Sequence, residues 1–226
     1  MKNTILHLAV VTLTGLFTSQ SFAQMFIESG QRSGRTEFTI QAAYQGSETF
    51  DLGAGSEMKT SSDTGFGMSF GHNIDNHWNI GFNMNFNNAN YNATVPLEGS
   101  TETTNIKSKV DSFNGQLNAT YHLFEGNLTP FISGGIGWTY TDSNIADGPP
   151  SSACWYDPWY GYYRCGYYQT THTDTSFSYN AAVGLRWDIS DKHFLRGSVG
   201  KQWVNMSIAD NTPSFTTGRI EFGFMM

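Results

Sequence analysis

The chain has 226 residues and a formal net charge of −7, and only 14% of its residues are charged, whereas 15% are aromatic and 24 residues are glycine. Soluble proteins usually carry about 25% charged residues, and phosphate binding needs clustered Lys and Arg, so the composition argues against an ordinary soluble enzyme and against a nucleic-acid partner. A mean hydropathy of −0.37 does not indicate membrane-spanning helices, but it is compatible with membrane-spanning strands, in which only every second residue faces lipid.

The first segment, residues 1–23, is predicted to be a secretory signal peptide. Lys2 gives it a positive start, residues 5–17 form a short apolar core, and Ser21 and Ala23 are small residues at the −3 and −1 positions of a cleavage site. An uncleaved membrane anchor is the alternative, although the apolar run is shorter than the about 20 residues that a span needs. We expect residues 24–226 to form the mature protein, a single barrel domain.

The mature chain repeatedly alternates apolar and polar residues with a period of two, which is typical of strands with one apolar face. The clearest example is residues 177–188, where aromatic and aliphatic side chains occupy the odd positions. A soluble β-sandwich could contain such a strand, but eight repeats favour a membrane barrel, since bacterial barrels have an even strand number. The predicted strands cover residues 37–44, 65–71, 78–87, 113–123, 132–140, 177–188, 195–200 and 219–226.

The connections between these strands alternate in length. Short turns are expected at residues 73–77, 125–129 and 189–192, and longer loops at 45–63, 88–106, 142–174 and 207–214. Outer-membrane barrels combine short periplasmic turns with long extracellular loops. This pattern predicts that both termini lie in the periplasm.

The polar face of the predicted strands would line the barrel interior. Eight strands leave room only for side chains or one small ligand, so a filled interior is favoured over an open polar conduit. Inward charges of both signs are expected to pair, since unpaired buried charge is costly; they are Glu37, Arg186, Asp188, Arg196, Arg219 and Glu221. Lys201 has the outward phase, so it either lies at a bulge near residues 200–202 or extends to the headgroups.

These segments resemble the small outer-membrane β-barrel family of Gram-negative bacteria, which includes OmpA-, OmpX- and OmpW-like barrels. The similarity lies in residues 65–82, in residues 117–140 and in the final RIEFGFMM, which resembles the C-terminal signal for barrel assembly but ends in Met226 instead of an aromatic residue. The resemblance implies an all-β, eight-stranded antiparallel up-and-down transmembrane barrel. Its expected partners are outer-membrane lipid, lipopolysaccharide and, during insertion, the barrel-assembly machinery. Fold alone does not fix the function.

The most individual segment is CWYDPWYGYYRCGYY at residues 154–168. Cys154 and Cys165 are expected to form a disulfide, because an exported protein meets an oxidising compartment. Tyr and Trp offer large, stiff contact areas, so one hypothesis is an extracellular loop that binds a surface glycan, lipopolysaccharide or a host ligand. The alternative, equally open, is that the aromatic residues only order the loop. The candidate contact residues are Trp155, Tyr156, Trp159, Tyr160, Tyr162, Tyr163, Tyr167 and Tyr168.

Catalysis has little support in the sequence. His172, Asp174 and Ser176 share a strand face, but a nucleophile needs its base within hydrogen-bond reach and a third group that orients the base. We therefore expect no enzyme activity, no cofactor and no metal, and a monomer with a structural or surface-interaction role. Porin-like passage of small apolar solutes is the first alternative, and a lipid A-modifying barrel enzyme is a minor one.

Overall fold

The structure is a computed structural model that describes residues 31–53, 56–96, 103–146, 149, 151–168, 170–206 and 212–226, so the predicted signal peptide lies outside the described residues. Among the described residues, no helix is long and apolar enough to cross a membrane. Within these ranges the chain forms twelve strands, β1 (Thr36–Gln45), β2 (Glu48–Gly53), β3 (Ser56–Thr60), β4 (Asp63–Asn73), β5 (Trp78–Pro96), β6 (Thr103–His122), β7 (Leu128–Ala146), β8 (Ser151–Asp157), β9 (Tyr162–Tyr168), β10 (Thr171–Ser190), β11 (His193–Asn205) and β12 (Ser214–Met225).

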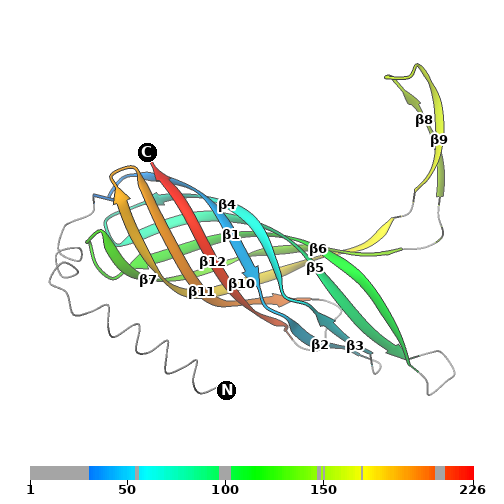
Figure 1. Cartoon of the computed structure of the whole chain (residues 1–226), viewed down its shortest axis with the longest axis horizontal. Coiled ribbons are helices and arrows are strands. Elements are labelled where there is room, and N and C mark those ends of the chain that lie inside the picture. Colours follow the sequence, from blue (N-terminus) through cyan, green and yellow to red (C-terminus); the bar gives the residue numbers. More distant parts are fainter. Residues whose placement is uncertain are drawn as a thin grey trace.

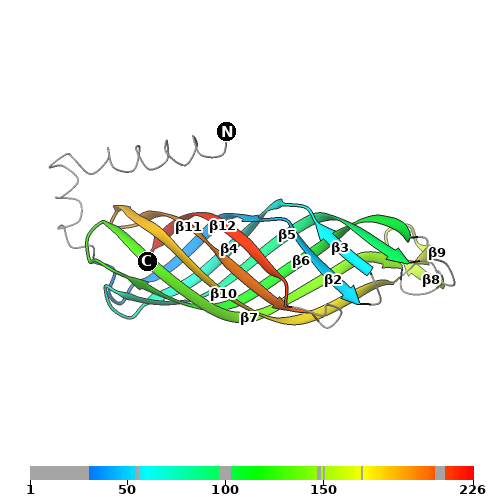
Figure 2. The ribbon, with the colours of Figure 1, turned by 90° about the horizontal axis from the view of Figure 1, so that it is seen from below.

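Eight strands close into an antiparallel barrel, seen from two sides in Figures 1 and 2. Ten strands share one sheet in the order β2-β3-β5-β4-β1-β12-β11-β10-β7-β6, and an additional β5–β6 pairing closes the ring, with β2 and β3 outside it. The first and last strands of the barrel pair from Glu37↔Met225 to Gln45↔Thr217. Six of the predicted segments lie within a barrel strand, and the other two, 113–123 and 219–226, extend one residue beyond β6 and β12. The predicted fold class is therefore confirmed.

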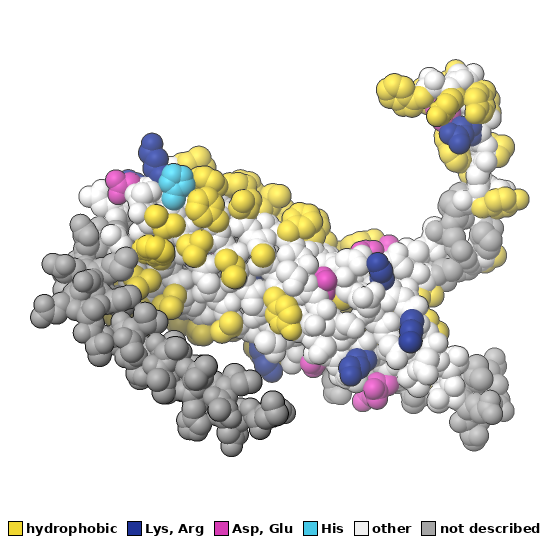
Figure 3. Space-filling view, in the orientation of Figure 1, with side chains coloured by type: hydrophobic (Ala, Val, Ile, Leu, Met, Phe, Trp, Pro, Cys, Tyr) yellow, Lys and Arg dark blue, Asp and Glu magenta, His cyan; other side chains and the backbone are white. Residues whose placement is uncertain are grey.

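The two faces of the barrel wall differ as the alternation predicted. Outward side chains such as Phe66, Ile136 and Ile220 are exposed, whereas inward side chains such as Gln116 and Arg186 are buried. Figure 3 shows hydrophobic side chains gathered over the wall near the C-terminus, with far fewer over the part of the barrel farther from it. An apolar band on the outside and polar residues inside are what a lipid-embedded barrel requires.

The barrel has two unlike ends. The short connections after β4, β6 and β10 meet near the C-terminus, and we call this the turn end (Figure 1). At the opposite end, which we call the extended end, β5, β6, β7 and β10 are 19 to 20 residues long. A strand crosses a bilayer in about 9–11 residues, so these four strands continue well beyond the apolar band.

The long loops predicted from the sequence are in large part strands. Residues 45–63 contain the β2–β3 hairpin, which pairs with β5 from Glu57↔Thr94 to Thr60↔Tyr91. β5 and β6 stay paired as far as Pro96↔Thr103, and residues 142–174 contain β8 and β9. The prediction of loops was wrong there because the apolar phase of the barrel strands does not continue. In β5 beyond Phe86, apolar residues such as Ala89 and Tyr91 face inward and asparagines face outward, so the alternation is inverted. Residues 207–211 of the fourth predicted loop lie outside the described residues.

The structure also decides the position of Lys201. It pairs in regular register with Ala181 on β10 and with Thr216 on β12, without a shift at residues 200–202. Its side chain is exposed on the outward face. The bulge interpretation is therefore wrong. Lys201 is a cation on the outward face of β11.

Candidate functional site

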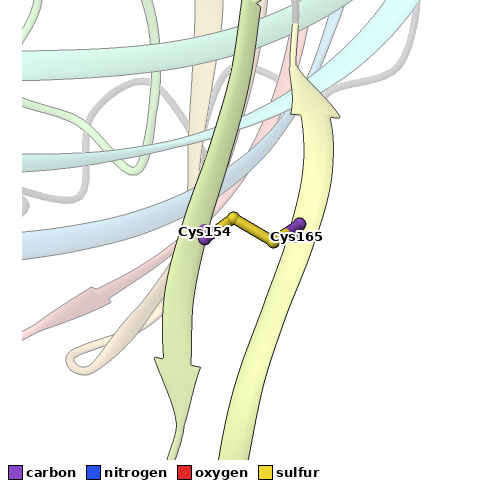
Figure 4. The surroundings of a disulfide bond; sticks show 2 residues. All are labelled: Cys154 and Cys165. Carbon is purple, nitrogen blue, oxygen red and sulfur yellow. A yellow bond between two sulfur atoms is a disulfide. The ribbon is translucent and has the colours of Figure 1, made fainter.

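The aromatic segment forms a separate hairpin, β8–β9, that projects from the extended end (Figure 1). The two strands pair from Ser151↔Tyr168 to Asp157↔Tyr162 and make a two-stranded sheet of their own. Cys154 lies directly opposite Cys165, and a disulfide joins them (Figure 4). The disulfide therefore braces a hairpin that lacks a core against which it could pack.

Local contacts shape the tip of this hairpin. The Asp157 carboxylate accepts a hydrogen bond from the Trp159 N–H at 3.0 Å, and its carbonyl accepts one from the Gly161 N–H at 2.8 Å. Gly161 has a φ of 70°, a left-handed conformation that costs other residues free energy. The Arg164 guanidinium lies 3.3 Å from the Asp157 carboxylate and 5.3 Å from the Tyr160 ring centroid. The sequence Asp-Pro-Trp-Tyr-Gly thus sets a defined turn.

The aromatic rings of the hairpin are mostly open to solvent. Tyr156 and Tyr163 meet edge to face at 5.5 Å between centroids, and the tilted rings of Tyr160 and Tyr162 lie 6.0 Å apart. Despite these contacts, each described ring is more than half exposed, from 51% for Trp155 to 92% for Trp159. The side chain of Tyr168 lies outside the described residues. Mutual packing therefore accounts for only a minor part of this aromatic surface, which Figure 3 shows on the projecting hairpin.

Charged side chains meet in the barrel interior at the turn end. The Arg186 guanidinium lies 2.6 Å from the Glu37 carboxylate and 2.7 Å from that of Asp188. Arg196 pairs with Glu221 at 2.8 Å and lies 3.7 Å from Glu37. All of these side chains are buried. The interior at this end is thus closed by a linked set of opposite charges.

Arg219, the sixth inward charge predicted, stands apart from these ion pairs. Among the described residues, no carboxylate lies within 4 Å of its guanidinium, although it lines a mid-barrel cavity together with Arg196 and Glu221. The structure places Arg219 on the same inward face of β12 as Glu221. Its charge therefore acts on the network through space and not through a direct contact.

Arg32 belongs to the same network, although no pattern in the sequence singles it out. It precedes β1, is fully buried, and lies 2.8 Å from the Asp188 carboxylate. Its guanidinium also donates to the carbonyls of Phe124 at 2.7 Å and Gly126 at 3.1 Å, and its Nε donates to that of Asn76 at 3.2 Å. Arg32 therefore ties the segment before β1 to two turns and to β10. No strand phase marks a residue that precedes the first strand, so alternation could not reveal it.

Amides and hydroxyls fill the middle of the interior. Asn180 donates to Asn118 at 2.9 Å, and Gln202 donates to Asn114 at 2.5 Å. The mid-barrel cavity has a volume of about 30 Å³, and a second cavity toward the extended end about 40 Å³. A single water needs about 10–15 Å³ by this measure, so each cavity could hold a few waters at most. The described side chains therefore leave little empty space in the middle of the barrel.

The interior becomes apolar at the extended end. Phe50 of the β2–β3 hairpin packs with Val204 of β11 and Phe215 of β12, and Met58 and Met206 adjoin them. These side chains line the cavity of about 40 Å³. The β2–β3 hairpin thus contributes to a small apolar chamber at this mouth of the barrel, which the sequence did not predict because Phe50 and Met58 lay in an expected loop.

Among the described residues, no hydrogen bond joins the His172 imidazole to Ser176, the possible nucleophile. The Ser176 hydroxyl lies 2.6 Å from the Asp174 carboxylate, to which it donates. The His172 backbone carbonyl accepts a hydrogen bond from Ser143, and the β7–β10 register shifts between Thr171 and Thr173. Ser176 therefore lacks the arrangement in which an imidazole base accepts the hydroxyl proton. Within the described ranges, no group of three or more His, Cys, Asp or Glu could hold a metal ion.

Comparison with known proteins agrees with this architecture. The family model described as Outer membrane protein beta-barrel domain matches residues 9–225. The structure of OprG from Pseudomonas aeruginosa is similar with a TM-score of 0.55, at 14% identity over 88% of this chain and 99% of OprG. Ail of Yersinia pestis, solved with the heparin analogue sucrose octasulfate, has a TM-score of 0.48 at 12% identity, over 86% of this chain and 99% of Ail. No curated protein sequence matches the chain.

Proposed function

Because the chain belongs to the outer membrane protein β-barrel domain family, we propose that it is a non-enzymatic outer-membrane barrel that binds a partner at the cell surface through the β8–β9 hairpin. In this proposal the turn end and both termini of the mature chain face the periplasm, and the extended end faces outward. The asymmetry between short turns and long extensions supports this orientation.

The observation that carries the proposal is the solvent exposure of the hairpin rings. Seven described Trp and Tyr side chains stand more than half exposed on a hairpin that a disulfide braces. Aromatic residues dominate binding surfaces because they bury a large area with few rotatable bonds. A preorganised hairpin also loses less conformational entropy on binding. A surface glycan or a host ligand is the class of partner that such an aromatic surface would fit.

Binding by whole cells tests this role. Trp155→Ala with Trp159→Ala should abolish most of the adhesion of expressing cells to host cells or immobilised glycans, since both rings are exposed and neither supports the barrel. Trp155→Phe with Trp159→Phe keeps an aromatic surface and should retain most of the adhesion. Unchanged adhesion of the alanine variant, at equal surface expression, would refute the proposed role of the hairpin.

Passage of small apolar solutes is the second candidate function. The observation in its favour is the apolar chamber of Phe50, Val204 and Phe215 at the extended end. Polar side chains and ion pairs fill the interior between this chamber and the turn end, and they argue against a continuous route along the barrel axis. Solute uptake by expressing cells and planar-bilayer conductance test it, and the absence of both would remove this candidate.

A further inference from the structure

Two open hollows lie one after the other on the outward face of β5 and β6. The first has a volume of about 440 Å³ and is lined by outward rings of β4 to β7, among them Phe66, Phe86 and Phe113. The second has a volume of about 460 Å³ and is lined by residues that include Asn92 and Lys107. Both hollows involve the same two strands, so they form one continuous strip on the outer wall.

The strand register fixes the order of side chains along this strip. From the apolar band outward, Phe86 pairs with Phe113, Asn88 with Asp111, Asn90 with Lys109, and Asn92 with Lys107. These residues share the outward phase of β5 and β6. The strip therefore changes from aromatic, through amide and carboxylate, to basic as it leaves the apolar band.

A third lysine joins the basic part from the neighbouring strand. Lys59 of β3 pairs with Asn92, so Lys59 and Lys107 flank Asn92 across three adjacent strands, which lie about 4.8 Å apart. Lys109 lies two residues along β6. All three lysines are exposed, and among the described residues no carboxylate lies within 4 Å of their ammonium groups. In a chain with a net charge of −7, this is a local concentration of unpaired positive charge.

The nearby carboxylates do not cancel that charge by direct contact. Asp111 accepts a hydrogen bond from Asn144 at 2.8 Å and another from Asn88. Asp63 accepts one from the Asn88 backbone N–H at 2.9 Å. Glu57 lies farther out, opposite Thr94. The carboxylates at the middle of the strip are therefore engaged with amides, and the lysines are free to bind an anion.

The spacing selects the class of anion. From Phe86 the strand advances about 13 Å to Asn90, opposite Lys109, and about 20 Å to Asn92, opposite Lys107. For a strand tilted by about 40° these advances are about 10 Å and 15 Å along the membrane normal. The polar layer on each side of a bilayer core is only about 5–8 Å thick, so an ordinary phospholipid phosphate would lie below the lysines. A lipid that carries phosphates on an extended sugar headgroup would reach them.

We propose that this strip of β3, β5 and β6 binds a phosphorylated glycolipid of the outer leaflet, a molecule of the lipopolysaccharide type. Its acyl chains lie against the rings of the first hollow, its sugars contact Asn88 and Asn90, and its phosphates bind Lys59, Lys107 and Lys109. The site is separate from the hairpin, and it rests on the proposed orientation, with the extended end in the outer leaflet.

Binding to the refolded mature protein in nanodiscs tests the site without depending on orientation in the cell. The probe is a purified lipopolysaccharide that carries phosphates on its inner-core sugars. Lys59→Gln, Lys107→Gln and Lys109→Gln together should weaken its binding roughly 100-fold, because each lysine near a lipid surface contributes about a fivefold change in affinity. The matched control is Lys201→Gln, which removes an outward lysine from the opposite wall and should bind like the parent protein.

The form of the probe separates the sources of binding. The same lipopolysaccharide after dephosphorylation should bind as weakly to the parent as the intact probe binds to the triple variant. Its deacylated, water-soluble form should also bind less tightly, because it cannot use the first hollow. Heat-modifiable gel mobility confirms that each variant is folded. Equal binding by parent and triple variant, equal binding after dephosphorylation, or equal competition by phosphatidylglycerol would overturn the proposal.

Discussion

Replacing Arg186 with Met probes the charge network that closes the turn end. The guanidinium is fully buried between Glu37 at 2.6 Å and Asp188 at 2.7 Å. Removing one partner of a buried ion pair costs about 3–5 kcal/mol. Each carboxylate keeps a second cation, Arg196 at 3.7 Å from Glu37 and Arg32 at 2.8 Å from Asp188. We therefore expect a loss of about 3 kcal/mol in the free energy of unfolding, at the lower end of that range.

The assay is equilibrium urea unfolding of the barrel in lipid vesicles, arranged as a double-mutant cycle. Glu37→Met alone should also destabilise the barrel, but the double variant should lose about 2 kcal/mol less than the sum, because it leaves no unpaired charge at this pair. Arg164→Met is the control, since its partner Asp157 lies on the exposed hairpin and such pairs contribute about 1 kcal/mol or less. Additive effects within about 0.5 kcal/mol would refute the coupling between Arg186 and Glu37.

Three further predictions concern the hairpin and the turn end. Serine at both Cys154 and Cys165 should reduce amide protection in β8–β9 by up to about 3 kcal/mol, the value for closing a short loop, while the urea midpoint of the barrel stays unchanged; a shifted midpoint would contradict a hairpin independent of the barrel. Arg32→Ala should destabilise the barrel by about 3 kcal/mol, because Asp188 loses one of its two cations and the buried Gly126 carbonyl loses the guanidinium donor. Hydrogen exchange should speed up first at residues 74–77 and 124–127, and unaltered exchange there would exclude a role of Arg32 in holding these turns. Asp75 accepts hydrogen bonds from the backbone N–H groups of Trp78 and His77, which lower the pKa of its carboxyl, so its stabilisation of the turn is present above the pKa of the unfolded chain and is lost as the pH falls through the lowered folded value. An NMR titration should place its midpoint below that of the unfolded chain, and an equal or higher midpoint would contradict this.

The barrel could be predicted from the sequence because its environment imposes the alternation. Between lipid outside and packed polar groups inside, every second residue must be apolar, as at Val183 and Leu185 beside Gly184 and Arg186. The same phase placed Glu37 and Arg186 on the inward side. Beyond the apolar band the outward face of β5 and β6 carries Asn, Lys and Asp, and inward residues such as Ala89 and Tyr91 are the apolar ones. The alternation is therefore reversed, and a search for outward apolar residues misses these strands.

The sites depend on contacts that the sequence does not encode locally. Lys59 lies near Lys107 only because β3 pairs with β5. Arg32 contacts Asp188 only because the segment before β1 lies at the turn end of the barrel. The spacing of Lys107 and Lys109, two residues apart opposite Asn92 and Asn90, is the one local signal of an outward basic strip. This spacing becomes informative only once β5 and β6 are known to continue beyond the apolar band.

Labelling of single cysteine variants in intact cells tests directly whether the barrel lies in the outer membrane with its extended end outside. Asn105→Cys places a thiol on the exposed face of β6 at the extended end, and Lys192→Cys places one in the last short turn. We expect a membrane-impermeant maleimide to label Asn105→Cys in intact cells, and to label Lys192→Cys only after the outer membrane is permeabilised. Labelling of Lys192→Cys in intact cells, or of neither variant before permeabilisation, would contradict this placement.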